Sequence, residues 1–277
     1  MKIPSSTYYY RLKTLPLRRE QEAKDWELKE LIENIQQDFP AYGYRKIFEE
    51  LRRRGTPHRL KILRRVQRKF KLFSRRKRGF RISTTDSNHN FKVYPNLLKN
   101  YGPVMGLDEV WVADITYIKI VSGFVYLAVI LDLCSRKAIG WAISEKIDTN
   151  LSLAALELAL ERRTPMPGCI HHSDRGVQYA SGDYVTLLKE WGLKISMSRK
   201  GNPYDNAWSE SFMSILKCEE IYLGEYDTIV DVVEGVSNFI DEVYNRKRIH
   251  SSIGYLTPEE FEEILMKKTE DKRPTHF

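Results

Sequence analysis

A run of three strand-like segments in the middle of the chain constrains its fold more than any other feature. Residues 110–120 alternate between apolar and polar positions and are rich in branched and aromatic side chains. Ser122-Gly123 supplies a tight turn, and residues 124–132 and 137–144 are typical of two further strands. Because connections this short join antiparallel neighbours, the segment predicts an antiparallel meander.

Helix and strand patterns alternate after the meander. The expected elements are a helix at 150–163, a strand at 169–172, a helix at 181–191, a strand at 193–198 and a helix from about 207 to 220. Three antiparallel strands followed by this alternation predict an α/β fold, a mixed five-stranded sheet with helices on both faces. This is the ribonuclease H-like arrangement, and we expect it over about residues 105–225.

A small all-α domain of helix-turn-helix type is expected before the sheet, over residues 25–82. Residues 1–24 are interpreted as a lead-in segment, and helices are predicted at 25–38, at 44–54 and after Pro57. The third helix has an apolar face, and its other faces carry Arg59, Lys61, Arg64, Arg65, Arg68 and Lys69. Such a basic last helix indicates DNA contact. The alternative is a helix that only packs against the catalytic domain.

The charge of the chain is unevenly distributed. Residues 41–81 contain 17 Lys and Arg but only two acidic residues, whereas the whole chain carries a net charge of +8. This basic block predicts a module that binds a polyanion, and a solvated helical face is the alternative. Residues 83–104 are expected to be a linker and residues 226–277 a helical tail. Arg246, Lys247, Arg248 and His250 of that tail either touch DNA or cap the core.

Three carboxylates lie on separate predicted elements of the sheet domain. Asp114 is within the first strand, Asp174 follows the fourth, and Glu210 is on the following helix. Singly, Asp114 could be a partnered structural residue and Asp174 a turn or helix-cap residue. Together, three such carboxylates can hold two Mg²⁺ ions about 4 Å apart. Oxygen ligands suit Mg²⁺, so the triple predicts in-line displacement at a phosphodiester.

Lys217 shares a helix face with Glu210, seven residues earlier. It is a candidate for holding a DNA phosphate, with an ordinary solvated lysine as the alternative. Other polar residues near the triad have structural interpretations. We expect Asp205 and Asn206 to cap the helix that follows them, Asp132 to serve a turn with Ser135 and Arg136, and His171 and His172 to pack within their strand.

The cysteines and the apolar segments bound the class of protein. Cys134, Cys169 and Cys218 are scattered, so neither a zinc site nor a disulfide framework is expected, and reduced thiols indicate a cytoplasmic protein. The longest apolar run, Phe124–Leu131, has the length of a strand and not of a membrane span. The first residues have no apolar segment of signal type.

The whole set of motifs resembles the second-reading-frame (OrfB) products of bacterial insertion-sequence transposases that share the retroviral integrase catalytic core. The matching stretches are 5–10 (SSTYYY), 42–45 (YGYR), 111–117 (WVADITY), 131–136 (LDLCSR), 171–179 (HHSDRGVQY), 201–210 (GNPYDNAWSE) and 244–258. By this resemblance, Asp114, Asp174 and Glu210 are the DDE triad and Lys217 is the basic residue that accompanies it.

The resemblance implies a DNA transposase with two bound Mg²⁺ or Mn²⁺ ions. Family members bind the terminal inverted repeats of their element, nick one strand and join that 3′ end to target DNA through a circular intermediate. We therefore expect a homo-oligomer on DNA, an upstream-frame protein as a further partner, and a cytoplasmic location at the bacterial nucleoid.

Two departures from the family pattern leave other functions open. The helix-turn-helix and leucine zipper that an upstream frame supplies have no counterpart in the sequence pattern, and no His/Cys zinc domain is visible. One alternative function is a ribonuclease H-type nuclease that does not join strands. Another is a regulator that only occupies element ends, although such a protein would not need three carboxylates.

Overall fold

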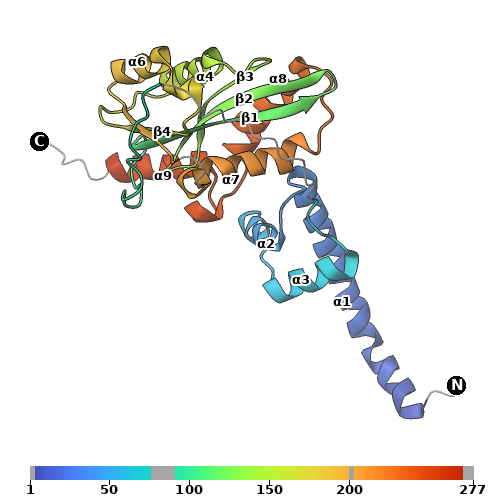
Figure 1. Ribbon diagram of the computed structural model, residues 1–277. Coiled ribbons are helices and arrows are strands. Elements are labelled where there is room, and N and C mark those ends of the chain that lie inside the picture. The colour runs from blue at the N-terminus through green and yellow to red at the C-terminus, as the bar shows by residue number, and fades with distance from the viewer. Residues whose placement is uncertain (1–3, 76–90, 200–202, 271–277) are drawn as a thin grey trace, which may run out of the picture. The chain divides into compact units, whose positions relative to one another are not determined.

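The computed structural model describes residues 4–75, 91–199 and 203–270, and the chain divides into two units, Met1–Arg76 and Lys77–Phe277 (Figure 1). Most of the basic run expected at 74–82 and the first part of the expected linker lie outside the described residues. None of the described helices is long and apolar enough to cross a membrane.

Three helices make up the first unit, α1 (Ser5–Asp38), α2 (Tyr44–Arg53) and α3 (Leu60–Phe70). The sequence predicted a helix only from about residue 25, with a lead-in before it, whereas α1 begins at Ser5. The reason for this error is that residues 5–24 bury no apolar face. Tyr9 and Leu17, for example, are both more than 60% exposed. A helix without a buried face does not need apolar residues at helical spacing, so its sequence lacks the pattern that predicts a helix.

The core of the first unit lies where the three helices meet. Its buried side chains are Leu28, Ile32 and Ile35 of α1, Ile47 and Leu51 of α2, and Leu63 and Val66 of α3. Gly55 follows α2 with a φ of +76°, a conformation that favours glycine, so the predicted end of this helix is confirmed.

A mixed five-stranded sheet forms the centre of the second unit. Its strands are β1 (Val110–Ile120), β2 (Gly123–Asp132), β3 (Ala138–Ser144), β4 (Ile170–Ser173) and β5 (Lys194–Met197). They lie in the order β3-β2-β1-β4-β5; β1–β2 and β2–β3 are antiparallel, and β1–β4 and β4–β5 are parallel. The predicted α/β fold is confirmed.

Helices and short helical turns alternate with the later strands and form the end of the chain. They are α4 (Thr149–Arg162), α5 (Val177–Ala180), α6 (Gly182–Glu190), a 3₁₀ turn (Pro203–Asn206), α7 (Ala207–Leu216), a π-helix (Lys217–Ile221), α8 (Ile229–Asn238), a second π-helix (Phe239–Tyr244), a 3₁₀ turn (Ser251–Ile253) and α9 (Pro258–Glu270). The helix expected to run to about 220 therefore changes to π geometry at Lys217.

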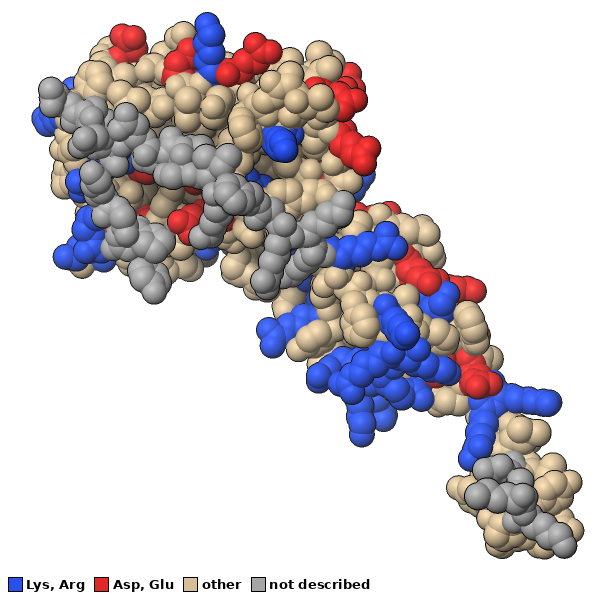
Figure 2. Space-filling view, turned by 45° about the vertical axis from the view of Figure 1, so that its right-hand side comes forward, with Lys and Arg blue, Asp and Glu red and all other residues tan. Residues whose placement is uncertain are grey.

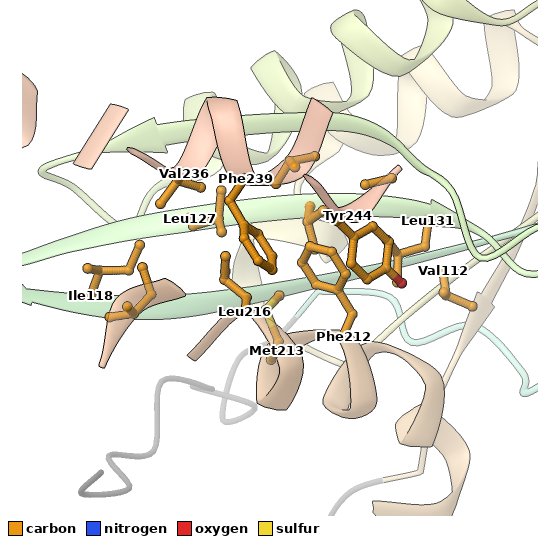
Figure 3. Close-up of a cluster of buried hydrophobic side chains, with 14 of the residues drawn as sticks. Val112, Ile118, Leu127, Leu131, Phe212, Met213, Leu216, Val236, Phe239 and Tyr244 are labelled. Carbon is orange, nitrogen blue, oxygen red and sulfur yellow. The ribbon is translucent and has the colours of Figure 1, made fainter. Parts of the chain in front are cut away.

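Each face of the sheet is covered by its own set of helices. Val112 and Ile118 of β1 share one core with Phe212 and Leu216 of α7 and with side chains of α8 (Figure 3). Trp111 and Ala113, whose side chains point to the other face of the sheet, pack with α4 and α6. Because side chains alternate along a strand, Asp114 lies on the face that α7 covers.

Candidate active site

Asp114 is a half-buried carboxyl group at the middle of the sheet. It pairs with Val129 across the antiparallel ladder, and its Oδ1 accepts a hydrogen bond of 2.9 Å from the Ile115 backbone N–H. Burial raises the pKa of Asp114 to about 8, and the neighbouring Asp174 carboxylate adds to this rise. Glu210 raises this pKa further by a smaller amount, and Lys217 lowers it. The other three predicted residues therefore all lie near enough to act on Asp114.

The register of the sheet explains why Asp174 meets Asp114. Val112 of β1 is opposite His172 of the parallel strand β4. Asp114 stands two residues further along β1, and Asp174 is the first residue after β4, so the parallel pairing brings Asp174 close to Asp114 on neighbouring segments about 5 Å apart. Asp174 follows the end of β4, as predicted.

A tight turn fixes the Asp174 carboxylate. The Gly176 backbone N–H donates a hydrogen bond of 2.9 Å to Asp174 Oδ1. A Cβ atom at Gly176 would lie 3.0 Å from that same oxygen and 2.8 Å from Oε1 of Gln178. The absence of a Cβ atom at Gly176 therefore leaves room for the Asp174 carboxylate in its hydrogen-bonded position. Gly176 lies within the 171–179 motif, but nothing in that local sequence predicts this role.

Glu210 lies on the first turn of α7, where its side chain is exposed. α7 is held against the sheet by Phe212 and Leu216, which are almost completely buried. Glu210 acts on the pKa of Asp114 more weakly than Asp174 does. Within the described residues, no three His, Cys, Asp or Glu side chains are arranged to hold a metal ion. The three carboxylates thus act on one another's surroundings at Asp114 without forming a closed cluster in the described part of the chain.

The donor chemistry of the site fits a hard divalent cation. All three candidate ligands offer carboxylate oxygens, which suit Mg²⁺ and Mn²⁺. The raised pKa of Asp114 means that its negative charge is poorly compensated by the protein alone. A bound cation would favour the ionised carboxylate, so the electrostatics of the site fit the metal as well.

Lys217 lies near enough to Asp114 to act on its charge. Its Nζ is 4.2 Å from the centroid of the Tyr117 ring on β1, and its charge lowers the pKa of Asp114. Tyr117 was part of a quoted motif without an assigned role. Its ring is in a position to support the ammonium group beside the carboxylates.

The neighbouring histidines and Asp132 have structural roles, as expected. His171 and His172 are fully buried and hydrogen-bond to Tyr184 and Ser196, and burial lowers the pKa of both imidazoles. Asp132 accepts hydrogen bonds from the backbone N–H and the hydroxyl of Ser135. The turn interpretation of Asp132 is confirmed.

The expected capping of α7 was wrong. Asn206 occupies the N-cap position, but its side chain makes no capping hydrogen bond. The Asp205 carboxylate is instead bound by Arg199, whose Nε and backbone N–H each donate at 3.0 Å. This charged partner competes with the helix end for the carboxylate and lowers the pKa of Asp205.

The basic residues of α3 fall into two groups. Arg59, Lys61, Arg64 and Arg68 are exposed, and Arg64 lies 5.1 Å from the Tyr44 ring centroid. Arg65 and Lys69 instead form ion pairs with Asp25 of α1, which is only 2% exposed. Figure 2 shows Lys and Arg side chains clustered on this helical unit. Among the residues that the structure describes, four of the six candidates therefore form no ion pair with an acidic side chain, and two help to hold α3 against α1.

Comparison with known proteins gives consistent matches. Two family models described as integrase core domain match residues 106–203 and 191–258. The chain is 37% identical over 261 residues to a 31 kDa protein of insertion element IS600 from Shigella sonnei, a match that covers 94% of this chain and 95% of that protein.

A second relative is the transposase InsF of insertion sequence IS3A from Escherichia coli, 40% identical over 222 residues, covering 80% of this chain and 76% of that protein. Among solved structures, the HTLV-2 integrase catalytic core domain in complex with magnesium is 15% identical. That match covers 55% of this chain and 94% of the viral domain with a TM-score of 0.41.

Proposed function

The chain belongs to the IS3 family of insertion-element transposases with an integrase core domain, and we propose that it binds the ends of a mobile DNA element, cleaves one strand there and transfers the 3′ end to target DNA. What supports this proposal most is the electrostatic coupling at Asp114, because Asp174 and then Glu210 add to the rise of its pKa that burial causes.

In this proposal, Asp114, Asp174 and Glu210 hold two Mg²⁺ or Mn²⁺ ions. When bound, the ions lower the pKa of the attacking hydroxyl and stabilise the leaving oxygen. The half-buried Asp114 and the turn-bound Asp174 are the pre-positioned ligands, and Glu210 completes the set from α7. In the first step, water attacks phosphorus and the bond to the 3′ oxygen breaks. In the second, the freed 3′-hydroxyl attacks a phosphodiester of the target, and the bond from that phosphorus to the target's own 3′ oxygen breaks as the new bond forms.

Lys217 has a separate role in both steps. We infer that its ammonium group binds a non-bridging oxygen of the reacting phosphate, because its position beside the carboxylates gives the site one positive charge that is part of the fold. A fixed positive charge at a phosphoryl group stabilises the negative charge that develops there. The nucleophiles are water and then DNA itself, so no covalent bond between enzyme and DNA is required.

Arg59, Lys61, Arg64 and Arg68 supply the proposed DNA contact of the helical unit. Exposed Lys and Arg side chains that neutralise phosphates release counterions and so provide most of the sequence-independent affinity. Homo-oligomerisation on DNA and pairing with an upstream-frame protein stay predictions.

Nicking and joining of a labelled element end in Mg²⁺ test the proposed reaction. Asp114→Asn, Asp174→Asn and Glu210→Gln keep the side-chain size but remove a ligand charge, so each should abolish both reactions while DNA binding persists. Glu157→Gln on the exposed surface of α4 is the matched control and should react like the wild type. Near wild-type nicking by any triad variant would remove that residue from the site.

The same assay separates the two rival functions. A ribonuclease H-type nuclease would cleave hybrid or branched substrates without joining strands. A regulator that only binds element ends would neither cleave nor join in Mg²⁺. Joined products from the wild type, absent without a divalent cation, would exclude both.

A further inference from the structure

Arg136, in the turn between β2 and β3, has an unusual backbone and an incompletely paired side chain. Its φ is +66°, a left-handed conformation that costs a residue other than glycine about 1 kcal/mol or more. Its backbone N–H donates to the Asp132 carbonyl at 2.9 Å, which holds the turn. Within the described residues, the buried Nε of Arg136 has no hydrogen-bond partner. Buried donors of this kind are rare and often belong to a binding site.

Charges around Arg136 leave its guanidinium under-compensated. Burial is the largest effect on the group and lowers the pKa of Arg136. Tyr244, Cys134 and then Asp132 raise this pKa by smaller amounts, and the oxygens of the one carboxylate among them, Asp132, already accept hydrogen bonds from Ser135 and from the Asp108 backbone N–H. Burial also raises the pKa of Asp132 to about 6, so this carboxylate is a weak counter-charge.

Two cavities meet at Arg136. They have volumes of about 210 and 360 Å³, and both are lined by Leu133, Arg136, Trp208 and Ser252. Much of the remaining wall is apolar, with Phe212 in the smaller cavity and Phe261 in the larger one, but the Asp132 carboxyl group and His250 also line the smaller cavity. The larger cavity combines a guanidinium donor, a hydroxyl group and an indole ring around a space large enough for a small anion.

The smaller cavity lies next to the triad. It is lined by Val112, two residues before Asp114 on the same face of β1, which corresponds to about 7 Å along the strand. Trp208 and Ser211 of α7, which also line it, are sequence neighbours of Glu210, although Trp208 points to the opposite side of the helix. A group bound here would therefore lie on the α7-covered side of the sheet, between the elements that carry Asp114 and Glu210.

We propose that Arg136, with Ser252 and the indole of Trp208, forms a phosphate-binding subsite, and that in the DNA complex it takes a backbone phosphate of the strand next to the scissile one. The planar guanidinium group can donate two parallel N–H hydrogen bonds to two oxygens of one phosphate. The indole offers an apolar surface for the attached sugar or base. The identification of DNA as the source of the phosphate rests on the proposed function, whereas the anion site itself does not.

Thermal melting with inorganic phosphate tests the anion site without DNA or divalent metal. At constant ionic strength, phosphate in place of chloride should raise the Tm of the full chain, since a ligand of the native state stabilises it. Arg136→Gln should abolish this rise. Arg136→Gly relaxes the left-handed backbone and should fold at least as well, yet it should also lose the response. Lys189→Gln, an exposed lysine of α6, should keep it.

DNA binding without divalent metal distinguishes a backbone phosphate from a free one. If Arg136 contacts DNA, Arg136→Gln should reduce the slope of log K against log salt by about 0.7 to 0.9. A lost phosphate response with an unchanged DNA slope would assign the site to free phosphate and overturn the DNA part. Phosphate and DNA responses that are equal in the wild type and both Arg136 variants would overturn the whole proposal. Failure of the wild type to nick DNA, with the phosphate response intact, would contradict only the proposed function.

Discussion

Arg248 binds Glu219 through two hydrogen bonds of 2.7 Å, from Nε to Oε2 and from Nη2 to Oε1. Arg248 is only 4% exposed, and Glu219 lies in the π-helix that begins with Lys217. His250 is buried beside Arg248. Of the two interpretations of the tail, the capping role therefore holds for Arg248 and His250. The Arg248–Glu219 ion pair attaches the tail to the π-helix that begins with Lys217.

Breaking this ion pair should destabilise the protein strongly. Arg248→Met leaves the Glu219 carboxylate unpaired in a nearly enclosed place, which costs about 3–5 kcal/mol. Urea denaturation of the full chain measures this loss. The double variant Arg248→Met with Glu219→Gln removes both charges and should recover part of it. If Arg248→Met unfolds at the same urea concentration as the wild type, the pair does not hold the π-helix.

Gly176→Ala should impair the reaction without changing any metal ligand. The added Cβ would lie 3.0 Å from Asp174 Oδ1 and 2.8 Å from Gln178 Oε1, so the carboxylate must give by a few tenths of an ångström while the flexible Gln178 side chain moves aside. Because a displacement of about 1 Å at a reacting centre can cost roughly 100-fold in rate, this smaller shift should cost less than that. Single-turnover nicking at saturating Mg²⁺ measures this cost. Gly182→Ala, where an added Cβ meets nothing within 4 Å, is the control and should react normally.

Asp114→Asn should stabilise the metal-free protein in a pH-dependent way. The pKa of Asp114 rises from 3.8 to about 8 on folding, so the folded state favours the proton and the wild type loses stability as pH rises through that interval. The asparagine variant avoids this loss. In EDTA, its advantage in Tm should grow from pH 4 to pH 8, reach at least about 2 °C, and then level off. An advantage that is independent of pH would mean that Asp114 is ionised without penalty.

The two groups of basic residues on α3 should respond differently to substitution. Replacing Lys61, Arg64 and Arg68 with Ala should flatten the slope of log K against log salt by about 2 to 3 units on duplex DNA. Arg65→Ala should instead lower the thermal stability, because it removes one partner of the buried Asp25. An unchanged slope in the triple variant would move the DNA-binding surface away from α3.

The sheet could be predicted closely because its strands carry strong local patterns. β1 has the predicted bounds, and the other strands differ by only one or two residues. The alternation also predicts that the side chains of Asp114 and Val112 lie on the same face of the sheet. The start of α1 could not be predicted in the same way, because its first half buries no apolar face and therefore has no period.

Features formed by distant residues left no local signal. Asp25 meets Arg65 and Lys69, more than 35 positions later, and a single acidic residue in a helical pattern does not reveal such partners. The cavities at Arg136 combine side chains from β1, the β2–β3 turn, α7 and the C-terminal segment. The pairing of Asp205 with Arg199 likewise replaced an expected helix cap.

The central claim is that Asp114, Asp174 and Glu210 hold the metal ions of DNA cleavage, and a ligand exchange tests it most directly. Asp174→Cys replaces a hard carboxylate with a softer thiolate, which favours Mn²⁺ over Mg²⁺. The account predicts that the ratio of nicking rates in Mn²⁺ and Mg²⁺ rises sharply above that of the wild type. An unchanged ratio, or wild-type nicking by Asp174→Cys in Mg²⁺, would contradict it.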